Sequence, residues 1–182
     1  RPGGGYWLVS ADGGVFAFGG AGYYGSMGGR FLDAPIVGMA ATPSGAGYWL
    51  VGADGAVFAF GDARYRGSLA NVRVAVPVVG IARTRTGGGY WLASARGGVW
   101  GFGDAAPLGG AARVLRASRH VARLVGVGSA DGYRMLAVGG RPDVPQVAPY
   151  MRGNAVRYAQ ARLRELGDVM PGRDGVFGSG TQ

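Results

Sequence analysis

The sequence predicts an all-β repeat array of β-propeller-like blades of about 42 residues, followed by a short C-terminal α-helical segment. Two observations lead to this fold class. The tetrapeptide Gly-Tyr-Trp-Leu begins at Gly5, Gly47 and Gly89, and the spacing is 42 residues both times. Glycine accounts for 39 of the 182 residues while 48% are hydrophobic, a combination that favours short strands and tight turns over helices. A β-trefoil is the alternative, because it also contains three similar units.

Each repeat predicts three or four short strands. Residues 6–10 and 15–18 flank an Asp-Gly pair, which predicts a hairpin with a primed turn, where φ is positive. Residues 36–40 form a third predicted strand, and residues 23–26 a less regular fourth. A decayed fourth repeat begins at Gly132, with Arg134 in the position of Trp.

Both faces of the Gly-Tyr-Trp-Leu strand are apolar. Because side chains alternate along a strand, Trp7 and Val9 share one face while Tyr6 and Leu8 share the other. This pattern predicts a strand enclosed between neighbouring units, with the recurring aromatic residues as packing. The alternative is that some indole rings stack on sugars, and the candidates are Trp7, Trp49, Trp91 and Trp100.

An arginine-rich segment interrupts the repeat between Gly110 and Leu124. Four arginines fall at helical spacing, which predicts one basic face: Arg113, Arg116, Arg119 and Arg123. This face is either a docking site for an acidic partner or a solvated loop or edge, and the solvated alternative is favoured.

Charge and composition exclude several classes of function. All 19 basic residues are arginine against 10 acidic residues, and the net charge of +9 predicts weak, salt-sensitive attraction to polyanions. The arginines are spread along the chain, so no specific nucleic-acid site is expected. Without cysteine and with one histidine, no thiolate nucleophile, metal centre or cofactor is expected. No apolar run approaches the roughly 18–20 residues of a membrane span.

The repeated phrases resemble a known kind of array. Gly-Tyr-Trp-Leu-Val, Asp-Gly-Gly-Val-Phe-Ala-Phe-Gly and Pro-Ile-Val-Gly-Met-Ala-Ala-Thr-Pro are similar to extracellular repeats of actinobacterial secreted and wall-associated proteins, which are often attached to lytic or peptidase modules. The resemblance covers about Gly5 to Gly140 and implies propeller-like repeats over residues 1–140. It also implies a secreted or envelope-associated location, with the signal peptide outside this chain. It supplies no catalytic residue and no characterised ligand.

A second resemblance follows a predicted linker at residues 141–150. Asn154 is a plausible N-cap of a helix that Gly167 ends, and Val156, Ala159, Leu163 and Leu166 form its apolar stripe. With the Asp-Gly-Val-Phe-Gly sequence that starts at Asp174, this pattern is similar to the small three-helix peptidoglycan-binding domain. Residues 151–182 are therefore expected to form a partial, truncated domain of that kind.

These expectations converge on a non-catalytic module of the cell envelope. It would bind peptidoglycan or wall polysaccharide, or act as a scaffold, and position a linked lytic or adhesive module. The alternative is a structural or interaction protein whose blades assemble with other chains through exposed blade edges. No pair of carboxylates is nominated for glycosidase chemistry, and no enzymatic activity is expected.

Overall fold

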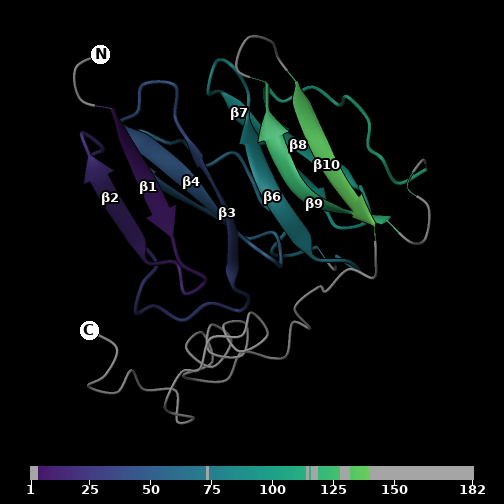
Figure 1. Ribbon diagram of the computed structural model, residues 1–182, viewed down its shortest axis with the longest axis horizontal. Coiled ribbons are helices and arrows are strands. Elements are labelled where there is room, and N and C mark those ends of the chain that lie inside the picture. The colour runs from purple at the N-terminus through teal and green to yellow at the C-terminus, as the bar shows by residue number, and fades with distance from the viewer. Residues whose placement is uncertain (1–3, 73, 114, 116–118, 128–131, 140–182) are drawn as a thin grey trace. The chain divides into compact units, whose positions relative to one another are not determined.

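The computed structural model describes residues 4–72, 74–113, 115, 119–127 and 132–139 (Figure 1). This part of the chain contains strands and loops but no helix, so the predicted all-β class is confirmed for it. In chain order the strands are β1 (Gly5–Val9), β2 (Val15–Gly19), β3 (Ile36–Ala41), β4 (Gly47–Gly52), β5 (Val57–Gly61), β6 (Val78–Arg83), β7 (Gly89–Ser94), β8 (Val99–Gly103), β9 (Arg119–Gly126) and β10 (Tyr133–Gly139).

The described strands form four separate antiparallel sheets, which we call the first to fourth units. The first unit contains β1 and β2, the second β3 to β5, the third β6 to β8, and the fourth β9 and β10. The fourth strand predicted at residues 23–26 is not formed. Gly25 there has a φ of 124°, and the Tyr24 amide donates to a tyrosine hydroxyl of the next unit rather than to a strand.

The internal contacts of the chain divide it into two compact parts, Arg1–Gln146 and Val147–Gln182. The second of these lies outside the described residues. The predicted linker at 141–150, the C-terminal helix and the partial peptidoglycan-binding-like domain at 151–182 therefore also lie outside them.

The Asp-Gly hairpin is present, but its turn differs from the prediction. In the first unit the Gly13 amide donates to the Ser10 carbonyl at 2.9 Å, and the Ser10 amide donates to the Gly14 carbonyl at 2.9 Å. Gly13 has a φ of 81°, whereas no described non-glycine residue has a positive φ. A type I′ turn needs positive φ at both central residues, so the turn is not primed. Asp12 instead accepts the Gly14 amide on its carboxylate at 3.0 Å.

In both three-stranded units the middle strand pairs with an inner strand on one side and an outer strand on the other. The pairing registers of the two units correspond residue by residue. At or near its start, each of the inner strands β3, β6 and β9 donates a backbone hydrogen bond to the hairpin of the preceding unit. The donor amides and acceptor carbonyls, each pair 2.9 Å apart, are Ile36 to Ala11, Val78 to Ala53 and Val121 to Ala95. A β-bulge then follows at the same place in all three inner strands. The repeat in the sequence is therefore a repeat of backbone hydrogen bonds as well.

The units pack face against face along the stack, with β3, β6 and β9 next to one another (Figure 1). On each middle strand, one face carries the Tyr and the Leu of Gly-Tyr-Trp-Leu, and we call it the Tyr face. The opposite face carries the Trp and the residue two positions later, and we call it the Trp face. Tyr48 and Leu50 of the second unit cluster with Trp7 and Val9 of the first. The same contact recurs between the second and third units and between the third and fourth.

Candidate functional site

The stack places the recurring tryptophans at the contacts between units. Three indole nitrogens donate to carbonyls 15 residues downstream: Trp7 to Gly22 at 2.8 Å, Trp49 to Arg64 at 2.9 Å and Trp91 to Ala106 at 2.7 Å. Trp49 is 0% and Trp91 1% exposed. Trp7 is partly buried, and Trp100 is partly buried against the cluster that contains Trp49. Sugar stacking is therefore corrected to packing for Trp49 and Trp91, whose rings have no open face.

The tyrosines add a polar clamp that sequence reasoning missed. The Tyr48 hydroxyl donates to the Gly25 carbonyl at 2.6 Å, and the Tyr90 hydroxyl donates to the Gly67 carbonyl at 2.6 Å. The Tyr133 hydroxyl donates to a glycine carbonyl in the same way. Burial raises the pKa of all three hydroxyls above 10.0, so they stay neutral donors at ordinary pH. These bonds could have been predicted from the sequence, because a loop glycine precedes each of the three tyrosines by 23 or 24 residues.

Of the four arginines predicted to share a helical face, the three that lie within the described residues are not on a helix. Arg119 and Arg123 belong to β9, which pairs with β10, and Arg116 lies outside the described residues. Arg113 and Arg123 are exposed. The helical spacing was misleading because strand pairing and the Val121 amide bond to the preceding hairpin override local periodicity.

Two carboxylates at the ends of β5 and β8 hold turns of their own units. The Thr84 hydroxyl donates to Asp104 at 2.8 Å, and the Thr86 hydroxyl donates to the other oxygen of that carboxylate. Hydrogen bonds from the hydroxyls of Ser44 and then Thr42 lower the pKa of Asp62 below 3.8. Both aspartates therefore support turns. Their partners lie 18 or 20 residues upstream, a spacing that could have revealed them.

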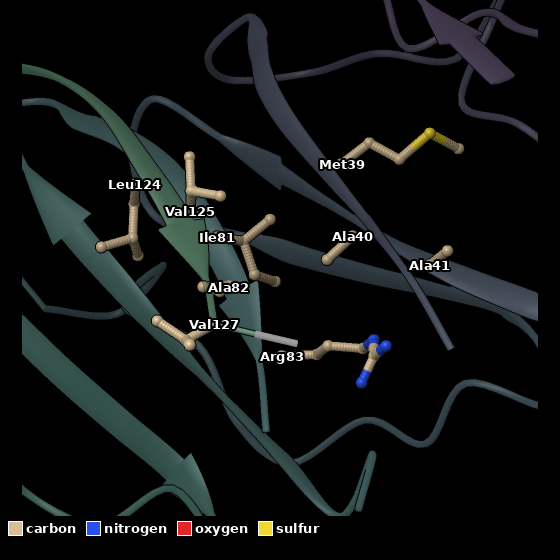
Figure 2. A pocket seen from close by; sticks show the side chains of 10 residues that line it. Met39, Ala40, Ala41, Ile81, Ala82, Arg83, Leu124, Val125 and Val127 are labelled. Atoms are coloured by element: carbon tan, nitrogen blue, oxygen red, sulfur yellow. The ribbon is translucent and has the colours of Figure 1, made fainter. Parts of the chain in front are cut away.

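A cavity of about 250 Å³ opens along the inner strands (Figure 2). β3, β6 and β9 line it, with small side chains such as Ala40 and Ala82 among larger aliphatic ones. Arg83 is the charged residue of the lining, and its guanidinium donates to the Thr84 carbonyl at 3.1 Å. Its other side chains are apolar, so backbone groups and the Arg83 guanidinium supply its polar surface.

A second groove, of about 330 Å³, lies between the turns of the second and third units. Arg64 and Arg66 line it together with Asp62 and Thr86. Both arginines are exposed, and Tyr65, which separates them in the sequence, has 58% of its surface exposed. This groove therefore offers cationic donors and a carboxylate acceptor, with an exposed aromatic ring on the segment that supplies both arginines. It is therefore the candidate site for a ligand that needs both side-chain donors and a side-chain acceptor.

No protein-family model matches this chain, and neither the curated proteins nor the solved structures contain a significant match to it. Within the described ranges, no group of three potential metal-ligating side chains occurs. The same ranges contain no helix that is long and apolar enough to cross a membrane.

Proposed function

We propose that this chain is a non-catalytic binding and scaffold module of the cell envelope. Its units would be blades of a β-propeller-like array, and it would position a linked lytic or adhesive module at peptidoglycan or wall polysaccharide. The proposal for the array is supported by the repeated contact between the Trp face of one unit and the Tyr face of the next. Secretion is part of the proposal, because wall binding requires it.

The groove between the second and third units is the observation that carries wall binding. Wall glycans present hydroxyl, N-acetyl and carboxylate groups, which need both donors and acceptors. Arg64 and Arg66 supply charged donors, and Asp62 supplies an acceptor. The exposed ring of Tyr65 offers an apolar surface on which a pyranose ring would stack. The net charge of +9 adds salt-sensitive attraction to anionic wall polymers.

A non-catalytic role agrees with what four of the described carboxylates do. Asp12 and Asp54 each accept a backbone amide of their own hairpin at 3.0 Å. Asp62 and Asp104 accept hydroxyls of neighbouring turns. These four groups support loops and are not paired with one another across either cavity.

A second candidate function is assembly with other chains. It is favoured by the apolar face that the first unit exposes at the end of the stack.

Retention on purified wall sacculi tests the first proposal with the full chain. We expect the wild-type chain to sediment with sacculi at low salt and less at high salt. The double variant Arg64→Ala/Arg66→Ala should lose retention. The variant Arg30→Ala/Arg96→Ala is the control. Both replaced arginines are exposed and neither lines the groove, and this variant has the same net charge as Arg64→Ala/Arg66→Ala. No retention of the wild-type chain at either salt would refute wall binding, and equal losses in both variants would refute the groove.

A further inference from the structure

The stack ends on an apolar face that nothing in the described chain covers. On the Tyr face of the first unit, Tyr6 is 57%, Leu8 54%, Phe16 57% and Phe18 41% exposed. The equivalent Tyr48 and Leu50 of the second unit are both 0% exposed. The rings of Tyr6 and Phe18 already stack on each other with centroids 5.0 Å apart. Contiguous apolar side chains of this size on a surface mark an interaction site.

The three internal contacts define what covers such a face. Each time, a Trp ring of one unit meets the Tyr ring of the next at nearly the same distance. The centroid separations are 5.7 Å for Trp7 and Tyr48, 5.6 Å for Trp49 and Tyr90, and 5.4 Å for Trp91 and Tyr133. The Tyr hydroxyl then bonds to a loop carbonyl of the Trp-bearing unit. The complement of a Tyr face is therefore a Trp face with its own loop.

The other end of the stack carries a different chemistry. Arg134 occupies the position of Trp on β10, which corresponds to the middle strands β4 and β7, and it is exposed. The aligned bulges place Arg123 where the earlier inner strands have Gly38 and Gly80. A Cβ on Gly80 would lie 3.3 Å from the Cβ of Leu124, so glycine at this position lets the next inner strand approach closely.

An arginine at that position obstructs such an approach. A charged outer face is also the usual way in which a repeat array ends. The fourth unit thus has the features of a capping unit, whereas the first unit has those of an internal one.

We propose that the Tyr face of the first unit docks a partner chain that presents a Gly-Tyr-Trp-Leu strand with its Trp face uncovered. The partner's indole would pack on Tyr6, and its loop carbonyl would accept the Tyr6 hydroxyl. A second copy of this chain does not fit, because its own units cover all three of its Trp faces and its fourth unit bears Arg134. The inference goes beyond wall binding and does not depend on it.

A probe made from the chain itself supplies the missing Trp face. Arg123→Gly and Arg134→Trp give the fourth unit the residues of an internal unit. Leu8→Arg and Phe16→Arg block the probe's own Tyr face, so that it cannot bind itself. The control probe carries only Leu8→Arg and Phe16→Arg. Light scattering of each probe mixed with the wild-type chain measures complex formation.

We expect a one-to-one complex of doubled mass with the probe, and binding at least about tenfold weaker with the control. Failure of the probe to bind would overturn the proposal. Equal binding of both probes, or oligomers of the wild-type chain alone, would also overturn it, because a second copy would then be the occupant. Near-ultraviolet circular dichroism and cooperative thermal unfolding establish that each variant is folded. If the probe with four substitutions is unfolded, a version with Arg123→Ala in place of Arg123→Gly replaces it, and the same outcomes apply.

Discussion

Replacing Tyr90 by Phe isolates the hydroxyl clamp between units. The Tyr90 hydroxyl donates to the Gly67 carbonyl at 2.6 Å and accepts the Arg66 amide at 3.0 Å. Phenylalanine keeps the packing of the ring but leaves two partly buried backbone groups without this partner. An unsatisfied buried polar group costs about 1–3 kcal/mol, so with partial relaxation we expect a loss of about 2 kcal/mol. For a chain of this size that corresponds to a melting temperature lower by about 4–8 °C.

Urea unfolding followed by tryptophan fluorescence measures this loss, and the chain provides its own control. Tyr6 occupies the same repeat position on the exposed end of the stack. Tyr6→Phe should therefore change the free energy of unfolding by less than about 0.5 kcal/mol. If Tyr90→Phe is no more destabilising than Tyr6→Phe, the hydroxyl bonds contribute nothing and the clamp is refuted.

Alkaline titration gives a second test of the same residue. Burial is the largest cause that raises the pKa of Tyr90 above its ordinary value of 10.0. As pH rises past 10.0, the unfolded chain loses this proton first, so the native state binds more protons and the free energy of unfolding falls. The stabilisation is complete below pH 10.0 and is lost as pH rises through the native pKa. Tyr90→Phe should make this alkaline decline shallower, and an unchanged decline would contradict the assignment.

Three further tests, with five variants, address the packing and the turns. Trp49→Ala should cost about 3–5 kcal/mol in urea unfolding, while Trp7→Ala, which is only partly buried, should cost less than half as much. Gly55→Ala should cost more than Gly45→Ala in thermal unfolding. Both glycines have positive φ, but a Cβ on Gly55 would lie 2.6 Å from a leucine Cβ, whereas nothing lies within 4 Å of one on Gly45. Asp62→Asn should flatten the loss of stability on acidification. Because the pKa of Asp62 is lowered in the native state, this carboxylate stabilises the fold above pH 3.8, and the stabilisation is lost as pH falls through the native pKa. If Asp62→Asn leaves the dependence of stability on acidic pH unchanged, the hydroxyl bonds to Asp62 do not contribute.

We expect the two ends of the stack to differ in association, because the first unit exposes its Tyr face and the fourth unit bears arginines. Leu8 and Phe16 belong to none of the hydrophobic clusters packed between units, whereas the equivalent Leu50 is fully buried. Association would therefore depend on residues whose replacement leaves the fold intact. This separation is what makes the docking experiment interpretable.

Local and periodic information was enough to predict the repeating strands from the sequence. The Gly-Tyr-Trp-Leu sequence recurs every 42 residues, and each strand and its turn form a hairpin of local sequence, such as Gly5 to Gly19. The two apolar faces of one strand already require a neighbour on each side. The sequence by itself therefore determined the all-β class, the hairpins and the packing role of the buried tryptophans.

Only the tertiary structure decided the features that depend on distant partners. The Tyr90 hydroxyl bonds to a loop 23 residues away, and Asp104 bonds to a turn 18–20 residues away. Arg119 and Arg123 have the spacing of a helix, yet they lie in a strand because pairing with β10 overrides local periodicity. Which apolar face is buried was also decided at this level, since Tyr6 and Tyr48 have the same local sequence and differ only in whether a Trp-bearing unit lies against them.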